Sequence, residues 1–331
     1  MKISDSDFLI QDSVKRMVTY LETQARAKGR NVESEPASTV RIYLLYLKQY
    51  CEEVAEQLPD EIIRSRNQDL KSDDIAVKTR HEQMANRFIT LLSKEKKSSN
   101  TVATALASVR EFYDTSYVQL SDKALIVPTG QAEKEVWLPD PQDLYRLVKV
   151  KKCSLRSAAY ICCAKDTGIG VGDMTEIKWS TPSAQYGTVK EQLKRGQWPI
   201  HIHFIREKTR VIFDTYFGSD AVEKLNEYAD FSHDRIFPIS ENQIRVDLKQ
   251  VDPRLLPHTF RKFFTTYVKM SLANELTKRG MFDSSGVSDA WVEYWCGHSL
   301  GKVKKAYNIP PVKMQMDVYR AVYPRIKLRK D

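Results

Sequence analysis

The stretch LPHTFRKFFTTYVKMSLAN, residues 256–274, predicts the helix around which the C-terminal part of the chain is organised. At 100° per residue its large apolar side chains share one arc, which we expect to face a core: Phe260, Phe263, Phe264, Tyr267 and Val268. His258 and Arg261 lie three residues apart at the edge of that arc, where both can address one ligand. A helix edge that merely carries charge has the same pattern, so a second observation is needed.

A second stretch, WCGHSLGKVKKAYN at residues 295–308, supplies further polar side chains. The apolar sequence before it predicts a short helix, and Gly297 permits the left-handed turn that ends such a helix. His298 follows at that turn, so a well-anchored corner holds its ring. Tyr307 comes nine residues later, after three lysines that lower the cost of bringing a phosphate close: Lys302, Lys304 and Lys305. An isolated tyrosine is usually a packing residue, but this one belongs to an ordered set.

Residues 198–217, WPIHIHFIREKTRVIFDTYF, have a different pattern. Two runs rich in Ile, Val, Phe and His flank a polar tip, which predicts a β-hairpin with a cationic turn. The tip carries Arg206, Lys208 and Arg210. The rest of the C-terminal region, including residues 145–164, reads as helix.

Helical periodicity also dominates the N-terminal part of the chain. Helices are predicted at 38–58, 72–96 and 98–117, with Ser38 and Ser72 as N-caps of the first two. The pattern weakens between about 118 and 139, where prolines appear. The predicted organisation has four parts: an N-terminal helical segment at 1–30, a helical DNA-binding domain at 31–120, a linker at 121–139, and a catalytic domain with a C-terminal tail at 140–331.

Composition restricts the class of protein. A chain of 331 residues with 42% hydrophobic residues can bury a real core and is better divided into two domains than one. The net charge of +9 favours a polyanionic partner, nucleic acid before an acidic membrane surface. No apolar run has the length of a signal peptide or membrane span. Five cysteines without a CxxC pair indicate buried thiols in a reducing compartment, so we expect a cytoplasmic protein.

These stretches together resemble the tyrosine recombinases, the site-specific DNA integrases, and most closely the integrases of archaeal viruses and plasmids. LPHTFRKFF is similar to the family's His-x-x-Arg box, WCGHSLGKVKKAYN to its second histidine and nucleophile, and REKTRVIFDTYF to its lysine-bearing hairpin. STVRIYLLYLKQY and SSNTVATALASVREFY resemble helices of its DNA-clamping domain. The resemblance extends over about residues 35–325. It implies a mainly α fold with a small β-sheet, in which two domains clamp DNA.

The resemblance also implies roles for individual residues. Tyr307 would be the nucleophile, Arg261 and His258 phosphate contacts, His298 a second donor and Lys208 the general acid. A tyrosine oxygen that attacks a DNA phosphodiester displaces the 5′-hydroxyl and leaves a phosphotyrosine. A phenol leaves more readily than an alkanol because its pKa is near 10, so the bond can be reversed without ATP. Such chemistry needs preorganised cations and a proton donor, and neither a metal nor another cofactor.

Double-stranded DNA attachment sites are the expected partner. The residues expected to contact DNA are Lys302, Lys304, Lys305, Arg206, Arg210, Arg41 and Lys48. The family resemblance implies a homotetramer on DNA, a monomer or weak oligomer without it, no membrane contact, and action inside the host of a virus or plasmid. Residues 312–331 show helical spacing and have two interpretations: they pack on their own domain, or they dock on a neighbouring subunit.

One position departs from the family. Its first arginine stands in a Thr-Gly-Leu-Arg-like turn, and in KDTGIGVGDMTEIKW, residues 165–179, Gly170 occupies the place of that arginine. Three explanations remain open: the chain is cleavage-impaired, naturally or deliberately; another cation substitutes; or this box is misaligned. The candidate substitutes are Arg156, Lys165 and Lys178. The first explanation is preferred because none of these occupies an obviously equivalent position.

The same glycines resemble a dinucleotide-binding fingerprint. That motif follows a strand, whereas the alanine-rich residues before Gly168 predict a helix, so we reject it. Three functions then compete. The leading one is a recombinase that integrates or excises a mobile element; the others are a DNA-binding protein that does not cut, and a nicking-closing enzyme like the type IB topoisomerases.

Overall fold

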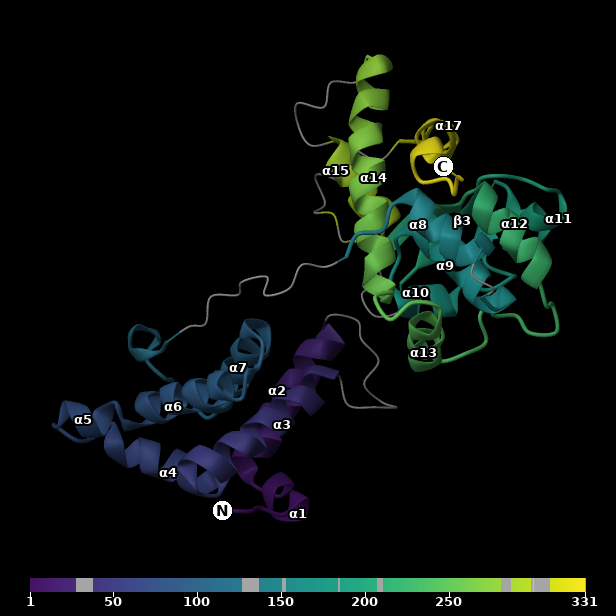
Figure 1. The fold of residues 1–331 in the computed structure, drawn as a ribbon. Coiled ribbons are helices and arrows are strands. Elements are labelled where there is room, and N and C mark those ends of the chain that lie inside the picture. The colour runs from purple at the N-terminus through teal and green to yellow at the C-terminus, as the bar shows by residue number, and fades with distance from the viewer. Residues whose placement is uncertain are drawn as a thin grey trace. The chain divides into compact units, whose positions relative to one another are not determined.

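The computed structural model describes residues 1–27, 38–126, 137–150, 153–183, 185–206, 211–280, 287–298, 300 and 310–330. The chain forms two compact units, Met1–Glu135 and Val136–Asp331 (Figure 1). Helices dominate both, and the strands described in the second unit form two small antiparallel sheets. The predicted mainly α fold with a small sheet and two domains is confirmed.

The first unit is a helical bundle. Its described elements are α1 (Asp5–Leu9), α2 (Asp12–Ala27), α3 (Ser38–Tyr50), the π-helix η1 (Cys51–Ala55), α4 (Pro59–Asp69), α5 (Ile75–Lys78), α6 (Arg80–Lys94), α7 (Ser99–Thr115) and the 3-10 helix η2 (Asp122–Ala124). The apolar stripe of α7 is buried as predicted: Val102, Ala105, Leu106, Val109, Phe112 and Tyr113. Phe8, Val14 and Met17 share this core, so α1 and α2 are part of the bundle.

The helix predicted at 72–96 is in fact two helices. Asp74 caps α5, because its carboxylate accepts a hydrogen bond from the Ala76 amide at 2.8 Å. Ser72, the expected cap, instead accepts from the Asp74 amide at 3.2 Å. α5 ends at Lys78 and α6 begins at Arg80. The periodic spacing of apolar residues continues across this break, so the sequence pattern does not reveal it.

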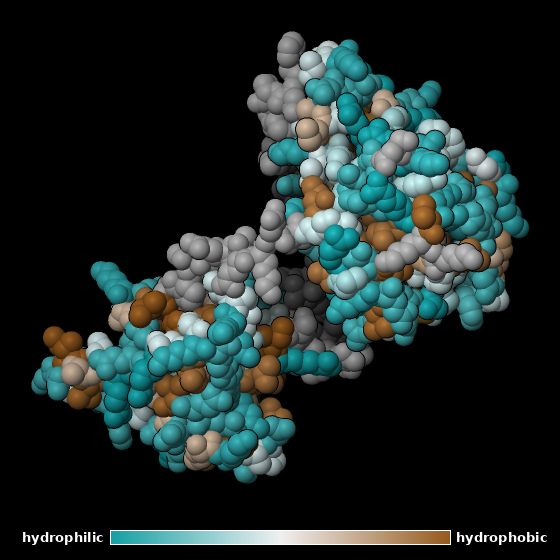
Figure 2. All heavy atoms as spheres, in the orientation of Figure 1, coloured by the Kyte–Doolittle hydropathy of each residue, from teal (hydrophilic) through white to brown (hydrophobic). Residues whose placement is uncertain are grey.

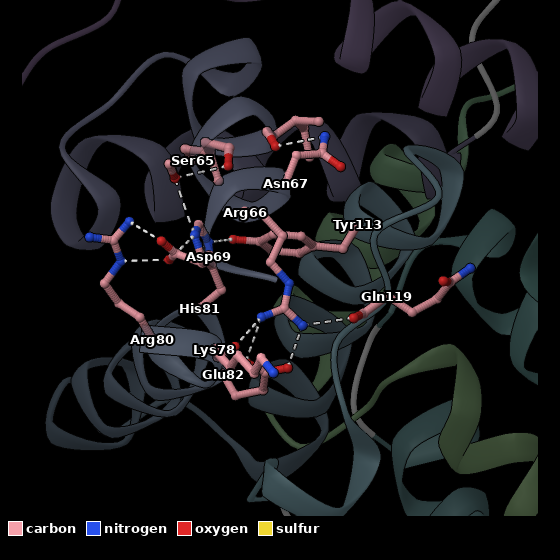
Figure 3. A network of polar contacts seen from close by, with 12 residues as sticks. Ser65, Arg66, Asn67, Asp69, Lys78, Arg80, His81, Glu82, Tyr113 and Gln119 are labelled. Atoms are coloured by element: carbon pink, nitrogen blue, oxygen red, sulfur yellow. Dashed lines mark hydrogen bonds and ion pairs between the residues drawn. The ribbon is translucent and has the colours of Figure 1, made fainter. Parts of the chain in front are cut away.

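A buried ion pair stabilises the first unit (Figure 3). Arg66 on α4 holds both carboxylate oxygens of Glu82 on α6, at 2.6 and 3.0 Å. The same guanidinium donates to the carbonyls of Lys78 and Gln119, at 2.7 and 2.9 Å. Next to it His81 contacts the hydroxyls of Ser65 and Tyr113. The network joins two helices to the segment that follows α7.

The second unit is organised around one buried helix, α9 (Leu155–Thr167). Its described elements are α8 (Pro141–Tyr145), the π-helix η3 (Arg146–Val150), α9 (Leu155–Thr167), α10 (Val171–Glu176), β1 (Pro182–Ser183), β2 (Gly187–Thr188), α11 (Val189–Lys194), β3 (Ile200–Ile205), β4 (Ile212–Phe217), α12 (Ser219–Tyr228), α13 (Glu241–Val251), α14 (Pro257–Lys278), α15 (Val287–Trp295), α17 (Val312–Val322) and the 3-10 helix η4 (Tyr323–Arg325). The side chains of α9 from Ser157 onward are buried. The single helix predicted at 145–164 is wrong, because Ser154 starts α9 by accepting from the Ser157 amide.

Most other predicted elements of this unit are confirmed. β3 and β4 pair in antiparallel register from Ile200↔Phe217 to Ile205↔Ile212, and the pair β1–β2 was not predicted. On α14 four residues of the predicted core face are buried, Phe260, Phe263, Phe264 and Val268, and the fifth, Tyr267, is half-buried. α15 ends before Gly297, whose φ of +74° is the expected left-handed turn. The helix α9 that precedes Gly168 also excludes the dinucleotide motif.

The C-terminal tail packs on its own unit. Met316, Tyr319 and Val322 on α17 belong to the core of the second unit. The Tyr319 hydroxyl donates to the backbone carbonyl of Asp166 at 2.8 Å, and Gln315 accepts from the Trp295 indole at 2.8 Å. The first of the two interpretations of the tail is therefore the one observed. Docking of this helix on a neighbouring subunit would require these buried contacts to break.

The visible face of each unit is mostly hydrophilic (Figure 2). Figure 2 shows hydrophilic side chains over most of the visible face, with hydrophobic ones in small groups between them. Within the described ranges, no helix combines the length and the apolar composition that crossing a bilayer requires. The five cysteines are unpaired, and four of them are buried.

Candidate phosphate-binding site

The guanidinium of Arg261 is the centre of the site. Arg261 lies in the second turn of α14, and its Nε donates to the carbonyl of Gly168 at 2.8 Å. Its Nη2 donates to the carbonyl of Cys296 at 3.1 Å, and its Nη1 contacts Nε2 of His298 at 3.1 Å. Three segments that are far apart in sequence therefore fix one cation.

Two glycine turns explain how these segments meet. Gly168 ends α9 with φ +63°, and a Cβ there would lie 2.8 Å from the Phe264 ring and 2.9 Å from the Cys296 sulfur. Gly297 has φ +74°, and a Cβ there would lie 2.8 Å from the Phe213 ring. Both turns thus need glycine for backbone conformation and for space. They bring two backbone carbonyls to Arg261.

The His298 imidazole is half-buried and accepts from Arg261. A guanidinium can only donate, so Nε2 of His298 carries no proton and the neutral ring has its proton on Nδ1. Burial lowers the pKa of His298, and the charge of Arg261 lowers it further. The sequence predicted that Arg261 and His298 belong to one site, and the structure places them in contact.

His258 occupies a different environment. It is exposed on the first turn of α14, one helical turn before Arg261. The spacing of three residues places both on one side of the helix, as the sequence predicted. Its access to solvent leaves it able to meet an incoming ligand.

Gly170 lies directly beside Arg261. Its backbone, with φ −69° and ψ 157°, precedes α10 in a conformation that any residue adopts. A Cβ at this position would lie 3.7 Å from Nη2 of Arg261 and 3.4 Å from Oδ2 of Asp173. A side chain here would thus enter the site.

The three cations considered as replacements are engaged elsewhere. Arg156 pairs with Asp247 at 2.7 Å. Lys165 is fully buried and pairs with Asp166 and Asp220, whose charges raise its pKa although burial alone would lower it. Lys178 is half-exposed and lies 4.0 Å from Asp234. None of these contacts directs a charge at Arg261.

A fourth cation, Arg206, does reach the site. It follows β3, and its Nε donates to both carboxylate oxygens of Asp173 on α10, at 2.9 and 3.0 Å. Its Nη2 donates to Asp173 at 2.5 Å and to the carbonyl of Cys296 at 3.4 Å. The sequence placed Arg206 only among DNA-binding residues. The available signal in the sequence was Asp173, an acidic residue in the first turn of the helix after Gly170, which could have been expected to pair with an arginine.

A second polar cluster fixes the hairpin to α15. Asp214 on β4 accepts from His201 at 2.9 Å, from His203 at 2.8 Å and from the Tyr294 hydroxyl at 2.7 Å. Burial acts to raise the pKa of the Asp214 carboxyl, but these hydrogen bonds outweigh it and lower the pKa to about 2. The strand that leads to Arg206 is therefore tied to the helix that leads to His298.

The remaining expected site residues fall into two groups. Six lie outside the described residues: Tyr307, Lys208, Arg210, Lys302, Lys304 and Lys305. Arg41 and Lys48 lie on α3 of the first unit, where Lys48 pairs with Asp5 at 2.5 Å. Arg41 is exposed on that helix.

Solved structures of known proteins include some with a similar fold. No protein-family profile matches the sequence, and no curated protein does so. A structure of lambda integrase (75–356), solved as a dimer bound to a COC′ core site, matches with a TM-score of 0.56 and 12% identity over 92% of this chain and 99% of that one. A lambda integrase tetramer bound to a Holliday junction matches with a TM-score of 0.53 and 13% identity over 92% and 79%. The fold is similar to that of lambda integrase.

Proposed function

We propose that this chain is a site-specific DNA recombinase of the tyrosine recombinase kind, which cuts and rejoins DNA through a 3′-phosphotyrosine at Tyr307. The observation that carries the proposal is the bond between Arg261 and His298 beside Gly170. These are the positions at which the family resemblance calls for phosphate-binding groups. The fold similar to lambda integrase supports it independently.

Arg261 is suited to hold the scissile phosphate. Among the described residues, its three anchoring bonds use three of five N–H groups, so phosphate oxygens can be bound without release of the anchors. The fork of a guanidinium matches phosphate oxygens in geometry. Exposed His258 adds a donor one turn away, and His298 can donate through Nδ1.

Tyr307 and Lys208 complete the proposed mechanism. The tyrosine hydroxyl loses its proton to water as its oxygen attacks phosphorus, the bond to the 5′-oxygen breaks, and Lys208 gives that leaving oxygen a proton. Attack by the free 5′-hydroxyl of another strand on the phosphotyrosine reverses these steps and reseals the DNA. The flanks of Tyr307, at Leu300 and Pro310, both belong to the second unit.

Double-stranded attachment sites of a viral or plasmid element are the proposed substrate. Phosphates would meet lysines and arginines of both units, so affinity should fall steeply with salt. Lambda integrase was solved as a dimer on a core site and as a tetramer on a junction. We infer a tetramer on two DNA sites for this chain as well.

A DNA-binding protein that does not cut is the second candidate, and Gly170 favours it. Loss of one preorganised donor at a reacting phosphate typically costs two to three orders of magnitude in rate. The recombinase would then be impaired in cleavage while retaining its fold and its DNA affinity.

A nicked suicide substrate that traps the cleaved strand tests the proposal. We expect a covalent protein–DNA adduct in the wild type and none in Tyr307→Phe, which keeps the ring and removes the nucleophile. Tight binding without any adduct would establish the second candidate. If strand transfer requires paired sites, the enzyme is a recombinase; relaxation of DNA without paired sites would indicate a topoisomerase-like activity instead.

A further inference from the structure

We propose that Arg206 supplies the cation that Gly170 lacks, by contacting the scissile phosphate next to Arg261. The inference rests on the proposed strand-cleavage function. If Arg206 has this role, the chain need not be impaired in cleavage. The second guanidinium then comes from the residue that follows β3, and not from the turn before α10.

The two guanidiniums converge on one atom. Nη2 of Arg261 donates to the carbonyl of Cys296 at 3.1 Å, and Nη2 of Arg206 donates to the same oxygen at 3.4 Å. These two nitrogens therefore lie no further apart than 6.5 Å. Charged donors sit about 2.8 Å from the phosphate oxygens that they bind. A single phosphate can thus bridge two donors at this spacing.

Arg206 also occupies the space that an arginine at position 170 would reach. A Cβ on Gly170 would lie 3.4 Å from Oδ2 of Asp173, and Nη2 of Arg206 lies 2.5 Å from that same oxygen. Nη2 is therefore within 5.9 Å of the missing Cβ, which is within the reach of an arginine side chain. A guanidinium is therefore present within reach of position 170, but it comes from another residue.

The environment of Arg206 favours a fixed orientation. Its side chain is 16% exposed, so solvent screens its charge only in part. Asp173 fixes Nε and Nη2, and within the described residues these bonds leave Nη1 to face a ligand. Phe213 lies under the guanidinium, 5.7 Å from the ring centre. The carboxylate offsets part of the charge and sets the direction of the fork.

Single-turnover cleavage of the suicide substrate tests this assignment. Arg206→Ala should lower the cleavage rate about 100-fold, the typical effect of one lost donor. Adding Gly170→Arg to Arg206→Ala should restore most of the rate, since Gly170 has room and an unstrained backbone. Arg235→Ala is the matched control, because Arg235 is an acid-paired arginine of the same unit and pairs with Glu176 at 2.8 Å. It should cleave at the wild-type rate.

A substrate with a neutral methylphosphonate at the scissile position separates phosphate contact from a structural role. This substrate lacks the charge that Arg206 would neutralise, so the wild type and Arg206→Ala should react at similar rates. An equal loss on both substrates would mean that Arg206 only holds the fold, and would overturn the assignment. If Arg206→Ala fails to fold, Arg206→Gln, which keeps a polar side chain without the charge, takes its place with the same expectation.

Failure of the inference differs from failure of the proposed function. Wild-type cleavage by Arg206→Ala would refute the role of Arg206 and leave the recombinase intact. Cleavage by Gly170→Arg but not by the wild type would show that Arg206 does not substitute. Absence of any adduct in the wild type and in Gly170→Arg would overturn the proposed function, and the inference with it.

Discussion

Arg261 and His298 are 37 residues apart in the sequence, and a hydrogen bond of 3.1 Å joins Nη1 of the first to Nε2 of the second. This bond connects the start of α14 to the turn that follows α15. It requires a neutral His298 in the free protein, because the guanidinium is always a donor. The protonation state of this ring is therefore a direct probe of the site.

The pKa of His298 should lie below 6.5 in the free protein and rise when DNA binds. Burial and the charge of Arg261 both disfavour the imidazolium, whereas a phosphate nearby favours it. Titration by NMR, with His298→Gln to assign the signal, measures the change. A His298 that titrates above 6.5 without DNA would contradict the observed contact.

Loss of the packing between α17 and the rest of the second unit should destabilise that unit. Tyr319→Ala deletes a buried ring and the hydrogen bond of its hydroxyl to the carbonyl of Asp166, so we expect a loss of about 3–5 kcal/mol in the free energy of unfolding. All five tryptophans lie in this unit, so their fluorescence reports its unfolding. Arg320→Ala, at an exposed neighbouring position, should change little. Unchanged stability in Tyr319→Ala would argue that the tail belongs on another subunit.

The Arg66–Glu82 pair should be costly to break. Glu82→Gln leaves the guanidinium buried without its counter-charge, and we expect a loss of about 3–5 kcal/mol in the first unit. Hydrogen exchange of α6 and α7 amides measures this unit separately. Arg110→Ala breaks a solvent-exposed pair with Asp122, and this control should cost less than about 1 kcal/mol. Equal effects of the two variants would show that burial does not matter here.

Acid should destabilise the first unit through His81. Burial lowers the pKa of His81 to about 4, outweighing the attraction of Asp69, whereas the unfolded chain has a pKa near 6.5. The unfolded state therefore binds the proton first, and stability is full above pH 6.5 and falls between 6.5 and 4, by about 3 kcal/mol. His81→Gln should flatten this part of the profile, measured by hydrogen exchange in the same helices. His233→Gln should leave it unchanged, and a profile that His81→Gln does not alter would refute the assignment.

Periodicity predicted the elements whose apolar pattern is uninterrupted. The α14 and α15 helices and the β3–β4 hairpin are found where their patterns lie, because burial of one face determines them. The breaks at Asp74 and Ser154 were missed, since a single side-chain oxygen that satisfies a helix end decides them locally. The spacing of apolar residues in the tail predicted a helix, but it does not indicate which surface this helix packs against.

The candidate site was predictable in part for a similar reason. Arg261, His298 and Gly170 were found because their residue types and order match one family. The place of Arg206 was not, since its partner Asp173 is 33 residues away and only the folded chain brings them together. In the sequence, a charged residue at a hairpin looks like any solvated cation.

If this chain cuts DNA as proposed, Tyr307 itself becomes covalently bound to DNA. The most direct test is to digest the trapped protein–DNA adduct and to identify the modified peptide by mass spectrometry. We expect a nucleotide joined through its 3′-phosphate to the peptide that contains Tyr307, and no adduct in Tyr307→Phe. An adduct on any other residue, or one that persists in Tyr307→Phe, would contradict it.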